Sequence, residues 1–353
     1  MFWAPERTVD PATSSSAAHL VRPLFDRLDP QLGFAKRLYL GDGGADYQPA
    51  TKQQLREILA AERTPAILFS ASHGLGYRQP DPRQVAQQGA LVTQEYVWRS
   101  PIGADQWFGA ADVGRDWQLR GLMHYAFACF GAGTPQYDDY DFSGAPAAIA
   151  AHPFVAALPR QLLRQGALAF IGHVELAWGY SFMPDGATQP GGLTATDAFQ
   201  RALRRLMTGE HVGHVLRDQH DRGVHLSSSL LDTIARSRQT QQVDEAEVAQ
   251  LWTERNDARA YIVLGDPAAR LRVDSLALDT SLPRPHHVHV AATSTITEQS
   301  SAAHQVFVPP PPTTGSAQID NELLEAWKEH VKLGFQHSDV MFRRVSAIRL
   351  NLR

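Results

Sequence analysis

The chain contains a single thiol, and its position is typical of a nucleophile. Cys129 is the only cysteine among 353 residues; it follows an apolar stretch (residues 121–128) and precedes Gly131 and Gly133. A neighbouring imidazole can activate such a thiol, either by holding the thiolate as an ion pair or by shuttling its proton. A lone cysteine is often a small buried hydrophobe. The position at the end of a predicted strand favours the catalytic interpretation.

His73 is the candidate base. Together with Gly74 it ends a second apolar stretch, residues 66–72. An acyl oxyanion needs backbone N–H groups that face it, and glycine lets a backbone approach a substrate closely. We therefore expect the N–H groups of Gly74 and Cys129 to be the oxyanion donors. The spacing, 129 − 73 = 56 residues, suits one intervening hairpin and a turn. Taken alone, His73 is equally well explained as a turn histidine that bonds to the backbone.

The elements around these residues indicate an α/β fold. Both apolar stretches have the length of buried strands, and ligand sites in parallel sheets form at the carboxyl ends of strands. A helix predicted at 153–165, which Pro159 starts or kinks, leads to a third strand at 167–174. This strand–helix–strand order predicts a parallel sheet. The other predicted elements are a strand at 37–40, a helix at 51–61 with Thr51 as N-cap, a strand or hairpin arm at 89–98, a helix at 194–207, two further helices and a last strand at 260–264.

Four segments are expected along the chain. Residues 1–32 are predicted to be an N-terminal arm on the surface, because residues 13–16 (TSSS) are small and polar, and the arm is assigned no function. Residues 33–278 form the main domain, and residues 279–316 are a linker rich in Pro, Ser and Thr.

The last segment, residues 317–353, is predicted to be an amphipathic helix. Its apolar residues fall on one helical face: Ile319, Leu323, Trp327 and Val331. We expect this C-terminal helix to dock across the site, to bind a regulatory partner, or to be released by cleavage.

Composition argues against several classes of function. The net charge of −4 and the lack of any block of Lys or Arg argue against nucleic-acid binding. No apolar run approaches the length of a membrane span, so no membrane association is expected. One cysteine excludes an internal disulfide and a multi-thiolate metal site, and the N-terminus lacks a signal-peptide pattern, so we expect a cytoplasmic protein without metal or cofactor. His286, His287 and His289 lie in the linker, where a metal cluster would be adventitious.

Three motifs resemble the landmarks of caspase-fold peptidases, especially the gingipain and CHAT branch. They are residues 69–74 (FSASHG), 127–133 (FACFGAG) and 264–271 (LGDPAARL). The resemblance covers roughly residues 35–275. It implies a caspase-like three-layer α/β/α sandwich with a mainly parallel central sheet, and cysteine endopeptidase activity with His73 and Cys129 as the dyad. The chain departs from caspases proper because Phe127 stands in place of their glutamine, so a preference for aspartate is not implied.

Several side chains are candidates for the substrate pocket. Glu175 and Trp178 follow the third strand and reach the same edge of the sheet, and His173 is close enough to line the site. The loop after Cys129 contributes three carboxylates: Asp138, Asp139 and Asp141. An acidic pocket would favour Lys or Arg before the scissile bond. The alternative is that these carboxylates belong to a solvated loop and a capping pair.

Two other polar residues are expected to be structural. His124 lies on the opposite face of its strand from Cys129 and is predicted to be a hydrogen-bonded core histidine. Asp266 is predicted to shape the turn after the last strand.

Three functions remain open on this basis. The first is a cysteine endopeptidase that acts on protein or peptide substrates, with Cys129 as nucleophile and His73 as base and then acid. The second is a catalytically silent caspase-fold module that works through its linker and C-terminal helix. The third is an acyl hydrolase or transferase, which would turn over small thioesters without cleaving peptides.

Overall fold

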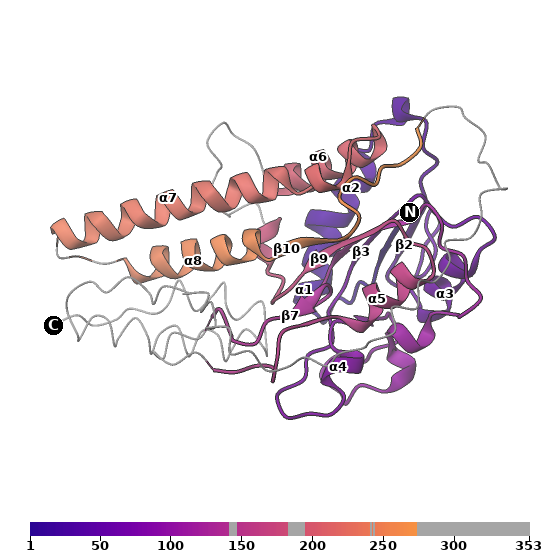
Figure 1. Cartoon of the computed structure of the whole chain (residues 1–353), viewed down its shortest axis with the longest axis horizontal. Helices are drawn as coiled ribbons and strands as arrows, with labels where there is room; N and C mark the ends of the chain where they lie inside the picture. Colours follow the sequence, from indigo (N-terminus) through magenta and orange to yellow (C-terminus); the bar gives the residue numbers. More distant parts are fainter. Residues whose placement is uncertain (141–146, 183–194, 241, 243, 274–353) are drawn as a thin grey trace, which may run out of the picture.

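The computed structural model describes residues 1–140, 147–182, 195–240, 242 and 244–273 (Figure 1). The predicted linker and C-terminal helix lie outside these residues, as does Asp141.

A six-stranded sheet forms the centre of the fold. Its order is β10 (Tyr261–Gly265), β9 (Ala169–His173), β6 (Met123–Phe127), β3 (Ile67–Ala71), β1 (Phe2–Ala4) and β2 (Leu38–Leu40). Every neighbouring pair is parallel except β9 and β10. The mainly parallel α/β sheet predicted from the apolar stretches is therefore confirmed.

The N-terminal segment belongs to this sheet, so its assignment as a surface arm is wrong. Phe2 pairs with Leu38 on one side and with Phe69 on the other, and Trp3 is fully buried. The next residues form helices α1 (Pro11–Ser16) and α2 (Arg22–Asp26), joined by a π-helical turn. A strand of three residues is too short for an alternating pattern to reveal it.

Helices cover both faces of the sheet. On one face the π-helical turn (Ala17–Val21), α2 and α6 (Ala195–Met207) pack on the strands; on the other face lie α3 (Lys52–Ala60) and α5 (Ala157–Arg164). Thr51 caps α3 as predicted, because its side chain accepts the N–H of Gln54 at 3.2 Å. This arrangement has the layer order of an α/β/α sandwich.

The predicted crossover between β6 and β9 is confirmed. Helix α5 connects these two parallel strands, and Pro159 lies in its first turn, where a missing backbone N–H breaks no helical hydrogen bond. Of the stretch 89–98, only Leu91–Val92 (β4) is a strand, which pairs with β5 (Trp107–Phe108). The remaining short elements are α4 (Gln84–Gln87), β7 (Gly133–Thr134) and β8 (Phe154–Val155).

Two long helices project from the sheet side by side: α7 (Arg217–Thr240) and α8 (Glu245–Arg259) (Figure 1). A separate apolar cluster joins them to the loops after β6 and β9; it includes Phe130, Tyr140, Leu176, Trp178, Leu226, Leu230, Ile234, Leu251 and Trp252. None of the described helices is long and apolar enough to cross a membrane.

Candidate active site

The register of two central strands brings His73 and Cys129 to the same level of the sheet. Strands β3 and β6 pair from Ile67 with Met123 to Ala71 with Phe127, an offset of 123 − 67 = 56 residues. The two site residues have the same offset, 129 − 73 = 56. Because the N–H of Ser72 donates to the Phe127 carbonyl at 3.0 Å, the register continues beyond the strands. Both residues therefore leave the sheet at the carboxyl ends of adjacent strands.

The backbone of Gly74 lies against that of Cys129. A Cβ atom at Gly74 would be 1.8 Å from the Cys129 carbonyl oxygen and 3.1 Å from its nitrogen, so only glycine fits. Among the described residues, no carbonyl oxygen accepts the N–H of Gly74 or that of Cys129. The two residues predicted to supply the oxyanion donors are thus in backbone contact.

A buried carboxylate orients His73. Nε2 of His73 lies 2.9 Å from Oδ2 of Asp10, whose side chain is 0% exposed against 31% for the histidine. The imidazole also stacks on Trp98, with the ring centroids 5.8 Å apart and an interplanar angle of 18°. Since Asp10 engages Nε2, Nδ1 is the nitrogen left to act as base.

Asp10 is itself held in place by α1. Its Oδ1 accepts the N–H groups of Ala12 and Thr13 at the helix N-terminus, and Nη1 of Arg7 lies 3.6 Å from Oδ2. Burial by itself raises the pKa of Asp10, but the hydrogen bond and charge of His73 and the bonds from Thr13 outweigh it, so the pKa is lowered. Sequence analysis missed this residue: Asp followed by Pro signals a helix start, but nothing in the sequence links it to His73.

The surroundings of the Cys129 thiol favour its protonated form. Burial raises its pKa to about 11, although the N–H of Ala177, 3.4 Å from Sγ, lowers it. A neutral thiol loses its proton during attack, which requires a base at that moment.

Phe130, the next residue, has a left-handed backbone conformation with φ = 56°, which is unfavourable for a bulky side chain. Packing of its ring and the hydrogen bond from its N–H to the Glu175 carbonyl, at 2.8 Å, hold this conformation.

One of the predicted acidic residues, Glu175, lies near the Cys129 thiol, and Asp138 and Asp139 lie near Glu175. Glu175 is buried, with 3% exposure, and its Oε2 has no hydrogen-bond partner among the described residues. Burial raises the pKa of Glu175 well above its usual value, and the charges of Asp138 and Asp139 raise it further. Glu175 in turn adds to the elevation of the Cys129 pKa.

Trp178 belongs to the same cluster. Its ring lies 5.5 Å from that of Tyr140, and both side chains are buried beside the half-buried Cys129. This face combines carboxyl groups with aromatic surface, which suits the aliphatic stem and charged end of a basic side chain.

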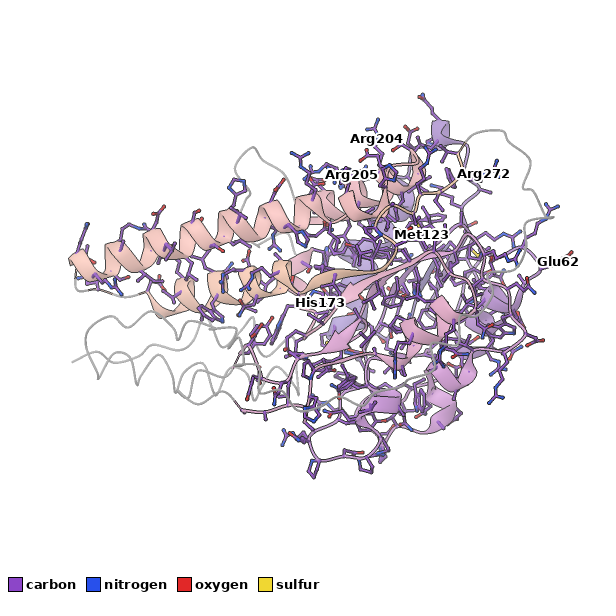
Figure 2. The ribbon with its side chains drawn as sticks, viewed as in Figure 1. Glu62, Met123, His173, Arg204, Arg205 and Arg272 are labelled. Carbon is purple, nitrogen blue, oxygen red and sulfur yellow. The ribbon has the colours of Figure 1, made fainter. Side chains whose placement is uncertain are left out.

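His173 lies in the core. Its side chain is fully buried, with the ring 4.2 Å from that of Tyr261 and Nε2 3.3 Å from Oδ1 of Asp257. Figure 2 shows it where the sheet meets α8. No described contact joins its side chain to His73 or Cys129, because His173 is still within β9, two residues before Glu175.

The two residues predicted to be structural are confirmed as such. His124 Nε2 lies 2.8 Å from the Ser70 hydroxyl in the core, and burial lowers the pKa of His124 to about 3. Asp266 accepts the N–H of Ala268 at 2.8 Å within the turn after β10.

No group of three or more His, Cys, Asp or Glu side chains within the described ranges is arranged to hold a metal ion. Comparison with protein-family models and with curated protein sequences gives no match for this chain.

Proposed function

We propose that this protein is a cysteine endopeptidase of caspase-like fold, with Cys129 as nucleophile and His73 as general base. The observation that carries the proposal is the shared offset of 56 residues: it brings His73 and Cys129 to the ends of adjacent strands at the same level, and Gly74 packs against the Cys129 backbone. The α/β/α layers and the mainly parallel sheet support the resemblance to caspase-fold peptidases.

The proposed reaction uses groups that the site provides. Nδ1 of His73 takes the thiol proton as Sγ attacks the scissile carbonyl carbon, and the N–H groups of Gly74 and Cys129 bind the oxyanion. The imidazolium, stabilised by Asp10, gives its proton to the leaving amine, which leaves a thioester on Cys129. Water, deprotonated by His73, then hydrolyses the thioester and frees the enzyme.

We further propose that the residue before the scissile bond is Lys or Arg. Glu175 supports this because its Oε2 is buried without a described hydrogen-bond partner. The nearby charges of Asp138 and Asp139 further disfavour the ionised form of Glu175 as long as no cation is bound. A bound ammonium or guanidinium group would satisfy the carboxylate.

The test is cleavage of a peptide library with basic, acidic or apolar residues before the scissile bond. We expect the wild-type chain to cleave after Lys or Arg, and Cys129→Ala and His73→Ala to abolish cleavage. His225→Ala is the matched control, because this histidine is exposed on α7. Cleavage that persists in Cys129→Ala would contradict the proposal.

Burial of the Cys129 thiol favours the alternative of a catalytically silent interaction module, because burial raises its pKa to about 11 and the thiolate is the nucleophilic form. Absence of cleavage across the library, with an intact fold, would support that alternative. Turnover of small thioesters alone would indicate an acyl hydrolase or transferase instead.

A further inference from the structure

One end of α8 is bonded to both loops that carry the acidic residues. The loop after β6 is held through the Asp139 carbonyl, which accepts from Trp252 Nε1 at 3.5 Å and from Asn256 Nδ2 at 3.3 Å. The loop after β9 is held through the next residue of the helix, Asp257. The loops that follow β6 and β9 are thus both held by hydrogen bonds to the same helix, α8.

Asp257 makes the closest contacts to the second loop. Its side chain is fully buried; Oδ1 accepts the Trp178 N–H at 2.8 Å, and Oδ2 accepts the Ser181 hydroxyl. The same hydroxyl lies 3.0 Å from the Tyr261 hydroxyl. The neighbouring residue, Ala177, is the one whose N–H meets the Cys129 sulfur.

Helix α7 reinforces this support through Arg222. Its guanidinium donates to Glu254 at 2.9 Å and to the Tyr180 carbonyl at 3.0 Å, and Nη1 lies 4.0 Å from Asp257. All three charged side chains are at most 7% exposed. Buried ion pairs of this kind contribute little net stability compared with apolar packing, so their best-attested role is to fix one geometry.

We propose that Asp257 is a positioning residue for substrate selection. By holding the loop from Glu175 to Ser181, it keeps the Glu175 carboxyl near the Cys129 thiol, while Trp252 and Asn256 hold Asp139 in the other loop. The inference rests on the proposed function for the acidic pocket, and it adds that the selectivity for a cation depends on α8.

The test measures whether the Cys129 thiol reacts faster with a cationic than with an anionic reagent, and it needs no peptide cleavage. Cys129, the only cysteine in the chain, is treated with 2-aminoethyl methanethiosulfonate, which is cationic, and with 2-sulfonatoethyl methanethiosulfonate, which is anionic. In each reaction the thiolate attacks the reagent's divalent sulfur, a disulfide forms and methanesulfinate leaves. The measured quantity is the rate of the cationic reagent divided by the rate of the anionic reagent. Because both reagents consume the same thiolate, this ratio does not depend on the thiol pKa.

Ser181→Ala is the decisive variant, because it removes one anchoring bond without changing any charge. We expect a wild-type ratio well above one, and a ratio about fivefold lower in Ser181→Ala, as expected for loss of one buried hydrogen bond. Asp257→Asn is expected to lower it further. Thr253→Val is the matched control: Thr253 is equally buried on α8, but its hydroxyl bonds to the Ala249 carbonyl within the helix, so the wild-type ratio should remain.

The outcomes separate this inference from the proposed function. A high wild-type ratio that Ser181→Ala leaves unchanged would overturn the anchoring role and leave the acidic pocket intact. A wild-type ratio near or below one would overturn the acidic pocket and the anchor together. If peptides are not cleaved but the ratio falls in Ser181→Ala, the anchor holds and the peptidase assignment fails. With Lys peptides, Ser181→Ala should raise KM and leave kcat nearly unchanged.

Discussion

Asp10 and His73 are 63 residues apart in the chain and form a carboxylate–imidazole pair at 2.9 Å. The pair fixes which imidazole nitrogen carries the proton, and in the proposed reaction it would give the imidazolium a buried counter-charge. The candidate thiol, histidine and carboxylates can be singled out from the sequence because each follows a recognisable strand. The sequence does not identify Asp10, because its pairing with His73 depends on tertiary packing, and it does not show that the His173 side chain is buried in the core.

Replacing Asp10 tests the orienting role. We expect Asp10→Asn to lower kcat by about 10²-fold or more and to leave KM nearly unchanged, because the amide allows the wrong tautomer. The folded-state pKa of Asp10 is lowered, so the carboxylate stays charged down to below its ordinary value of 3.8 and the defect should persist from about pH 5 to pH 8. Steady-state kinetics across this range measure it.

The helix cap provides the control for this variant. Asn is as good an N-cap as Asp, so α1 should remain intact. Asp10→Asn should still unfold cooperatively in urea, but with a lower free energy of unfolding than the wild type, because the buried Arg7 guanidinium loses its counter-charge. A variant with wild-type kcat would show that the pair does not serve catalysis.

At the scale of elements, the strand register places the site. The β3–β6 pairing and its continuation at Ser72 were predictable as parallel strands, but the register itself was not, since apolar strands buried on both faces allow shifts without exposing polar residues. The predicted strands are also longer than the observed ones, because apolar residues continue into the buried loops.

The close contact between Gly74 and the Cys129 backbone can be tested by substitution. Gly74→Ala should abolish peptide cleavage, because its Cβ would lie 1.8 Å from the Cys129 carbonyl oxygen and the backbones must separate. Gly76→Ala is the matched control: its Cβ would meet only the Phe130 ring, at 3.6 Å. Parallel assays of both variants measure the difference, and an active Gly74→Ala enzyme would contradict this geometry.

His124 on β6 gives a second prediction at this scale. The unfolded chain protonates this histidine below its ordinary pKa of 6.5, whereas the folded chain keeps it neutral down to about pH 3. Its contribution to stability is therefore full above pH 6.5 and is lost as the pH falls, by about 3 kcal/mol at pH 4.

The measurement is the free energy of unfolding in urea at pH 7 and pH 4, for the wild type and for His124→Gln. The variant should lose less stability than the wild type over this interval. Equal losses would show that His124 is not held neutral by the fold.

In the whole molecule, the N-terminal segment (residues 1–32) is central to the fold, although its sequence predicts a surface arm. Strand β1 lies between β2 and β3, and the same segment supplies Asp10 to the site, so one stretch supports both the sheet and the base. The layers and the crossover are predictable from the sequence, because the helix and strand periods are local patterns that each segment shows by itself. The sequence does not reveal a three-residue strand whose polar neighbours belong to a short capped helix.

Trp3 tests this placement. Its side chain is fully buried in the core beneath α3, and Nε1 donates to the Thr51 carbonyl at 3.3 Å. We expect Trp3→Ala to lower the free energy of unfolding by about 3–5 kcal/mol. Val9→Ala, at a position that is 66% exposed in the same segment, should change it very little. Equal changes in the free energy of unfolding of the two variants would show that the N-terminal segment lies on the surface and not in the sheet.

The proposed dyad is tested by intact-mass analysis after treatment with a lysyl peptide acyloxymethyl ketone, which alkylates a thiol only when it is activated and the peptide is bound. We expect one adduct per chain, located on Cys129, with labelling lost in His73→Ala and slowed in Asp10→Asn. Labelling that proceeds equally in His73→Ala, or that is equally rapid with an aspartyl peptide, would contradict the proposed dyad or its basic specificity, respectively.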